Sequence, residues 1–275
     1  MAEPIFMSDE DDPRMVEAHR AAQQSFKYFW RELSWERRRI VPGLGVAMIK
    51  LAFTDGPRTD GKPDYEQMWC TDVEFDGETL KAKLINAPNW LQSVKVGDAV
   101  EVPFAELSDW IMTANDVAYG AYTVQVMRAG MGGAERRAHD KAWGLDFGDP
   151  NEVQVEVNRT RKKPGFIARL LGAKSATSEE AAPQTGFRDH PMCVNMLEAY
   201  DTQLQGDPSI ATTPDERGWS MIHGEALAGN LGVIKLLLKH GADSNAKTPE
   251  GKDAAALARG IGWDEIADYL TNEAK

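Results

Sequence analysis

The C-terminal fold is decided by residues 218–251, GWSMIHGEALAGNLGVIKLLLKHGADSNAKTPEG. The small side chains of Ala226 and Ala228 allow two short helices to approach each other closely, and Gly241 suits a left-handed helix C-cap. The pattern starts again at Gly251, which indicates an internal repeat of helical hairpins. The apolar residues that would stack one hairpin on the next are Ile234, Leu237 and Leu238.

Residues 215–245 resemble an ankyrin repeat, with Ile222-His223 at the place of its usual Leu-His pair. Residues 251–270 are similar to a terminal copy. The resemblance implies an all-α ankyrin-repeat domain over residues 190–275, with clear copies at 215–247 and 248–272 and a degenerate cap at 190–210. Because one repeat cannot bury its own core, we expect this short stack to pack against the N-terminal domain or against its own cap.

The N-terminal part has a different periodicity. A helical spacing of apolar residues begins after Asp12-Pro13, which suits an N-cap followed by proline. From Val46 apolar residues recur at every second position. This alternation is typical of an antiparallel sheet with one solvent-exposed face. We predict an α+β domain over 13–147, with a curved, mainly antiparallel sheet packed on the first helix. The expected strands are 46–53, 68–75, 79–86, 98–104 and 121–127, and a helix could follow over 133–143.

Roughly residues 18–130 resemble a bacterial family of YegJ-like domains of unknown function. This resemblance implies an α+β domain and supplies no mechanism. The motifs that carry it are FWRE at 29–32, EQMW at 66–69, LINAP at 84–88, VKVGDAVEV at 94–102, ELSDWIM at 106–112 and GAYTVQVMR at 120–128.

Residues 148–189 are expected to link the two domains. A short strand at Val153–Val157 precedes a basic run, Arg159–Lys174, that contains no acidic residue. The plain interpretation of this run is a solvated linker, because its apolar part is too short to anchor alone. Contact with anionic lipid, with an acidic partner or with the acidic lead Asp9–Asp12 is the alternative.

Composition narrows the function classes. The 275 residues carry a net charge of -12, which disfavours nucleic acid as a partner. The two cysteines are far apart in the sequence, so we expect no disulfide framework. This favours an intracellular protein. No apolar run approaches the length of a membrane-spanning helix. We therefore expect a cytoplasmic protein without stable membrane association.

The ankyrin resemblance implies that a partner protein binds the turn tips and the inner helix face. Trp219 at a turn tip is either an anchor for the partner or a plug against the preceding degenerate unit, and the sequence does not decide between them. The predicted partner-binding residues are Arg217, Trp219, Met221, Glu225, Glu250 and Lys252.

A ligand groove in the N-terminal domain is a second hypothesis. Carboxylates, an amide and indole walls could bind a polar ligand or a peptide. The structural interpretation is stronger, since Asp109 can cap a helix, Asn86 suits a turn and Trp110 fills a core. The candidate groove residues are Glu66, Trp69, Asn86, Asp109 and Trp110.

No catalytic, cofactor or metal signature stands out. Cys70 and His139 could form a nucleophile and base, but an inert strand thiol is more usual. The glycine-rich stretch 128–138 lacks the last glycine of a dinucleotide-binding loop, so a flexible loop is the better interpretation. The histidines show no ligand spacing with the cysteines. We predict no catalytic residue, no metal and no cofactor.

The leading hypothesis is therefore a non-enzymatic, cytoplasmic bacterial protein-interaction module, in which the ankyrin stack binds a partner. A regulatory or toxin-neutralising pairing is a more specific version. The alternative is an N-terminal enzyme or small-ligand receptor, with the repeats as a targeting element.

Overall fold

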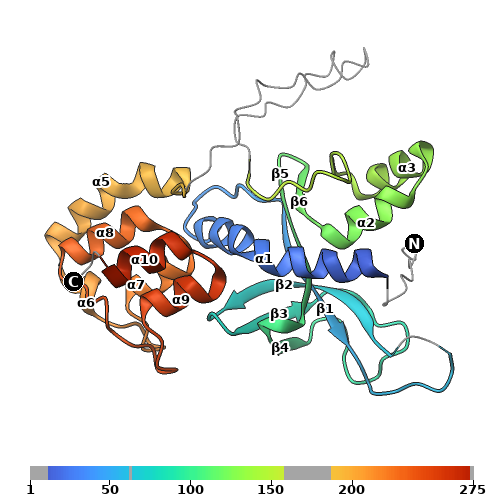
Figure 1. Ribbon diagram of the computed structural model, residues 1–275, viewed down its shortest axis with the longest axis horizontal. Coiled ribbons are helices and arrows are strands. Elements are labelled where there is room, and N and C mark those ends of the chain that lie inside the picture. Colours follow the sequence, from blue (N-terminus) through green and yellow to red (C-terminus); the bar gives the residue numbers. More distant parts are fainter. Residues whose placement is uncertain (1–11, 62–63, 158–186, 273–275) are drawn as a thin grey trace, which may run out of the picture.

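The computed structural model describes residues 12–61, 64–157 and 187–272 (Figure 1). Helix α1 (Pro13–Glu36) begins after Asp12, whose side chain accepts a hydrogen bond from the Arg14 N–H. This is the predicted N-cap followed by proline at the first helical position. One face of α1 is buried throughout its length, and Phe26, Phe29 and Trp30 pack against aromatic residues of the sheet.

The N-terminal sheet is antiparallel throughout and has the strand order β4-β3-β2-β1-β5-β6. The α+β class predicted for this region is thus confirmed. The strands are β1 (Val46–Phe53), β2 (Glu66–Phe75), β3 (Thr79–Leu84), β4 (Ala99–Pro103), β5 (Leu107–Ala114) and β6 (Val117–Gly120). A short 3-10 turn, Phe104–Glu106, joins β4 to β5.

Two local predictions in this region are wrong. Residues 121–127, expected as a strand, belong to helix α2 (Tyr122–Gly130), and residues 153–157 form no strand. Sequence periodicity missed two strands, the short β6 and also β5, in which all eight residues are buried. Apolar and polar residues therefore do not alternate in it, and period two gives no signal. The predicted helix over 133–143 is present as α3 (Gly133–Trp143).

The C-terminal region is all helical, as predicted. Its hairpins are α7 (Met221–Leu227) with α8 (Leu231–Lys239), and α9 (Ala254–Ile261) with α10 (Asp264–Asn272). The first helices of the two hairpins, α7 and α9, pack together. The preceding segment forms α5 (Pro191–Gly206), which packs on α8, and the short α6 (Ser209–Thr212), which packs on α7.

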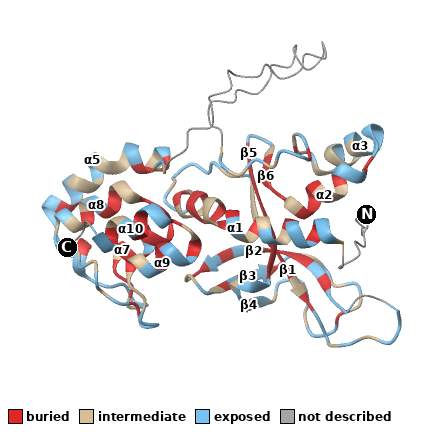
Figure 2. Cartoon of the chain, viewed as in Figure 1, coloured by how far each residue is buried: buried red, intermediate tan, exposed pale blue. Residues whose placement is uncertain are grey.

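Helix α1 lies along the sheet, and its C-terminal end points toward the C-terminal helices (Figure 1). Its buried residues join those of α7, α9 and the sheet in one hydrophobic cluster, so burial runs across the junction without a break (Figure 2). A smaller cluster under α2 and α3 lies apart from it. The basic run 159–174 and residues 9–11 of the acidic lead lie outside the described residues. None of the described helices is both long and apolar enough to cross a membrane.

Candidate functional site

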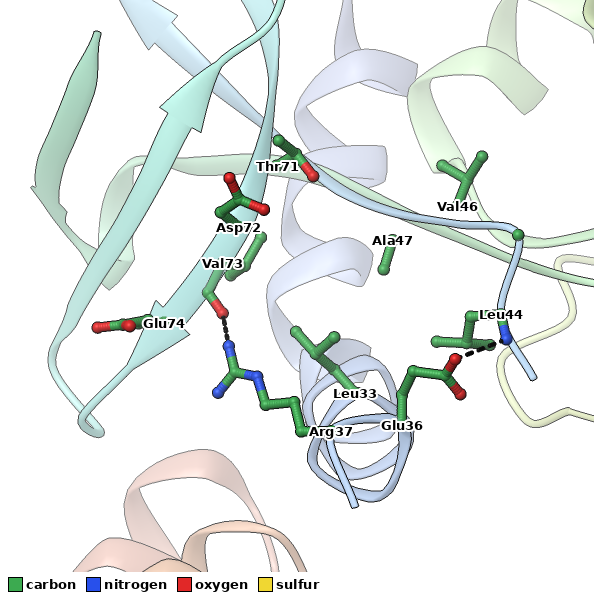
Figure 3. Close-up of a pocket in the computed structure, with 11 residues that line it drawn as sticks. Leu33, Glu36, Arg37, Leu44, Val46, Ala47, Thr71, Asp72, Val73 and Glu74 are labelled. Carbon is green, nitrogen blue, oxygen red and sulfur yellow. Dashed lines mark hydrogen bonds between the residues drawn. The ribbon is translucent and has the colours of Figure 1, made fainter. Parts of the chain in front are cut away.

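A pocket of about 550 Å³ opens where strands β1 and β2 separate, beside the C-terminal end of α1 (Figure 3). Apolar side chains and a charged rim share its wall. Its lining residues are Leu33, Glu36, Arg37, Leu44, Gly45, Val46, Ala47, Thr71, Asp72, Val73 and Glu74. The pocket is open to solvent, and polar groups make up the larger part of its wall.

The separation of the two strands follows from a β-bulge in β2. The pairing of β1 with β2 ends at Ile49 and Cys70, and the register of β2 with β3 shifts between Thr71 and Glu74. Asp72, inside the bulge, has a φ of 54°. Bulges bend a strand and re-aim its side chains, so the start of β1 and the end of β2 diverge and leave the pocket between them.

Two charged residues of the pocket wall are held by the protein itself. The Glu36 carboxylate accepts hydrogen bonds from the N–H groups of Gly43 and Leu44 and pairs with Arg39. The Arg37 guanidinium donates to the Val73 carbonyl, and burial lowers the pKa of Arg37. The carboxylates of Asp72 and Glu74 are exposed at the rim.

The predicted groove residues do not line this pocket and do not converge on one place. Glu66 accepts hydrogen bonds from the Asn89 backbone, and the Asn86 side chain accepts one from the Trp69 N–H. Trp110 is fully buried and donates its indole N–H to the Ala22 carbonyl. Each of these side chains supports the local fold, and the groove remains a prediction.

The structure does bring Trp69 and Asp109 close to one side chain, Lys50. Lys50 is paired with Trp69 on β2 and with Asp109 on β5, and its ammonium lies 4.6 Å from the Trp69 ring centroid. The Lys50 Nζ donates to Thr123 Oγ1 at 2.6 Å, and that hydroxyl donates to Asp109 Oδ2 at 2.6 Å. Burial raises the pKa of Asp109 and lowers that of Lys50.

Asp109 also caps helix α2. Its carboxylate accepts hydrogen bonds from the backbone N–H groups of Tyr122 and Thr123, which begin that helix. A carboxylate at a helix N-terminus satisfies donors that lack partners inside the helix. The Lys50–Thr123–Asp109 chain is thus a closed structural network, with every member buried.

The other predicted chemical groups lie apart. Cys70 is buried in the core beside α1, and burial raises the pKa of its thiol to about 12. His139 lies on α3 and contacts Asp140 at 2.9 Å. In the glycine-rich stretch, Arg136 donates to the carbonyls of Arg128 and Met131. Across the described ranges, no three His, Cys, Asp or Glu side chains are grouped to hold a metal ion.

The predicted partner-binding residues divide into two groups. Arg217 and Glu250 are exposed and Met221 is half-buried. Trp219 is buried, with its ring against His223 and its backbone N–H on the Asp215 carboxylate. Glu225 pairs with Arg38 in the turn that follows α1, and Lys252 pairs with Glu78 of the β2–β3 turn. The last three therefore contact the protein's own chain.

The repeat stack packs against the N-terminal domain, as one of the two expectations had it, but sequence reasoning did not identify the residues of this junction. Trp35 donates its indole N–H to Asn230 Oδ1 at 2.9 Å and stacks on His190, and Glu32 contacts His190 at 2.9 Å. The available signal was the run WRELSWERRR at 30–39. Its charged and indole side chains exceed what a helix needs to cover one side of a sheet.

Comparison with known proteins identifies the regions on either side of this junction. Residues 12–147 match the family described as an uncharacterized protein conserved in bacteria, DUF2314. A putative ankyrin repeat protein of Neisseria meningitidis serogroup B is 36% identical over 267 residues, which is 97% of this chain and 96% of the relative. The uncharacterized protein YegJ of Escherichia coli is 30% identical over 76 residues, 28% of this chain and 46% of YegJ. Both resemblances inferred from the sequence are thereby confirmed.

Proposed function

Because this chain belongs to the same family as the putative ankyrin repeat protein of Neisseria meningitidis, we propose that it is a non-enzymatic protein-interaction protein of the bacterial cytoplasm. Ankyrin repeats recognise proteins and carry no chemistry of their own. The observation that carries the proposal is the similarity over nearly the whole chain to a protein named for its repeats. A regulatory or toxin-neutralising pairing is the form that we favour.

The turn tips are the part of the stack that a partner could reach first. Arg217 lies in the turn before α7 and Glu250 in the turn before α9, and both are exposed. Arg217 is paired with Asp215 at the surface, where an ion pair contributes little to stability. Reversing these two charges should therefore disturb recognition and leave folding intact.

A pull-down from bacterial lysate tests the proposal. The wild-type chain should retain one protein in stoichiometric amount, and Arg217→Glu with Glu250→Lys should lose it. A matched control reverses Arg14 and Glu17, which are exposed on α1. Trp219→Ala is unsuitable because Trp219 is buried and its loss would disturb the fold. Absence of any stoichiometric partner, or equal loss in the control, would count against the proposal.

The pocket between β1 and β2 favours a second candidate, a small-ligand receptor in the N-terminal domain. A thermal-shift panel of nucleotides, sugars and short peptides tests it. One compound should raise the melting temperature of the wild-type chain by several degrees, and the rim variant Glu74→Lys should remove that rise. Glu106→Lys, a charge reversal at another exposed site, should keep it. A panel without any shift removes this candidate.

A further inference from the structure

We infer that the N-terminal domain binds the ankyrin stack of the same chain. It covers the side of the stack that is formed by α7, α9 and the links that follow these two helices. An outside partner is then restricted to the turn tips and to those parts of the second helices that α5 does not cover. This inference rests on the proposed function and refines it, because it separates predicted partner-binding residues that are available from those that the chain already uses.

The contacts start at the second link, between α9 and α10. The Lys27 ammonium donates to the Gly262 carbonyl at 2.6 Å and lies 4.9 Å from the Trp263 ring centroid. The Arg31 guanidinium also lies over this ring, at 4.8 Å, and Tyr28 meets it edge-on. Trp263 is buried. Two cations and a tyrosine of α1 therefore cover this link.

The contacts continue at the first link, between α7 and α8. The Trp35 indole bonds Asn230 Oδ1, and Asn230 Nδ2 donates to Glu225 Oε2 at 2.7 Å. The Glu225 carboxylate, only 1% exposed, pairs with Arg38 at 2.8 Å. A buried carboxylate without its cation is costly. The stack thus depends on Arg38, just after α1, to neutralise the charge of Glu225 in α7.

The β2–β3 turn covers a third part of the same side. Gly77 lies against Leu227 of α7 and Leu257 of α9, and Glu78 pairs with Lys252 at 2.6 Å. Gly77 has a φ of +94°, and a Cβ built on it would lie 2.9 Å from Leu257 Cδ2. The turn needs glycine both for its backbone conformation and for its close approach to the stack.

These contacts leave little of this side to another protein. A partner that used Glu225 or Lys252 would have to displace Arg38 or Glu78. Helix α1 cannot leave, because its Phe26 and Phe29 are buried in the core of the N-terminal sheet. The stack therefore differs from a free repeat module, because the N-terminal domain of the same chain already contacts α7 and α9.

Lysine footprinting of the full-length wild-type chain tests this inference. Lys252 is 25% exposed in its ion pair, whereas Lys239 and Lys247, also in ion pairs, are 60% and 54% exposed. With an acetylating reagent, Lys27 and Lys252 should react about tenfold more slowly than Lys239 and Lys247, because reaction requires local opening of the junction. Equal rates for the four lysines would overturn the inference.

Matched variants test the cover of the β2–β3 turn. Gly77→Ala and Glu78→Gln should each raise the reaction rate of Lys252 severalfold and leave Lys239 unchanged. Gly56→Ala is the control, because Gly56 has a similar φ of +98° and nothing lies within 4 Å of its added Cβ. It shares the backbone strain without the contact. If neither variant changes the Lys252 rate, the turn does not cover the stack and the inference fails.

Neither measurement requires a partner, so the result is independent of the pull-down. Slow acetylation of Lys27 and Lys252, together with a pull-down that captures no protein, would support the inference and reject the proposed function. Rapid reaction with a captured partner would do the reverse.

Discussion

Arg38 and Glu225, 187 residues apart in the sequence, form an ion pair of 2.8 Å between the end of α1 and helix α7. Arg38 also lies 4.6 Å from the Trp35 ring centroid, and Trp35 bonds Asn230, which in turn bonds Glu225. Arg38, Trp35, Asn230 and Glu225 therefore form a ring of interactions that joins the N-terminal domain to the C-terminal helices. The strength of this junction can be measured at one position.

Arg38→Met should lower the free energy of unfolding by about 1–3 kcal/mol. Loss of one partner from a buried pair costs about 3–5 kcal/mol, and we reduce this because Arg38 is 31% exposed. Urea denaturation measures the loss. Arg20→Met, on the exposed face of α1, should change little, and adding Glu225→Gln to Arg38→Met should recover part of the stability. Equal effects at Arg20 and Arg38 would contradict the prediction.

Gly229→Ala should destabilise the chain by about 2–4 kcal/mol. Gly229 has a φ of +75°, and its added Cβ would overlap the Trp263 indole, so backbone strain and overpacking combine. Gly241→Ala isolates the strain, because Gly241 has a φ of +93° and open space around it. The difference between the two midpoints in urea measures the contact of Gly229 with Trp263. Identical midpoints would show that this contact contributes nothing.

Asp109→Asn should cost about 1–3 kcal/mol and loosen the start of α2. An asparagine amide can replace only one carboxylate oxygen as acceptor, so the bonds to either Tyr122 N–H or the Thr123 donors are lost. Hydrogen exchange should be faster in the first turn of α2. Asp98→Asn, at an exposed turn in the β3–β4 loop, is a control in which α2 exchange should not change.

His19 should make stability depend on pH below neutrality. Burial lowers the pKa of His19 beneath its ordinary 6.5, although the Asp109 carboxylate opposes this shift. The unfolded chain then binds a proton more readily than the folded chain, so stability falls as pH drops from about 7 through the lowered pKa. His19→Gln should flatten this dependence in urea midpoints measured from pH 7.5 to 5. An unchanged slope in the variant would contradict the assignment.

Sequence patterns predicted most of the architecture, because most elements bury only one side. The alternation in β3 and the helical spacing of α1 are examples. They failed where burial is two-sided, as in β5, and where a distant side chain decides the local structure, as at α2. There the capping carboxylate comes from Asp109, 13 residues before Tyr122. The pocket depends on a bulge that has no local signature, and the junction depends on contacts between distant segments, of which the run at 30–39 marks only one side.

The order in which a ribosome makes the chain gives the Arg38–Glu225 pair a further meaning. Domains generally begin to fold during synthesis, starting from the N-terminus. Helix α1 and its sheet emerge long before α7, so Trp35 and Arg38 lack their partners Asn230 and Glu225 until α7 and the link after it are translated. A prematurely terminated product would display that uncovered indole and guanidinium surface, which makes it a natural target for chaperones and proteases. Completion of the C-terminal helices would then protect the finished protein from degradation.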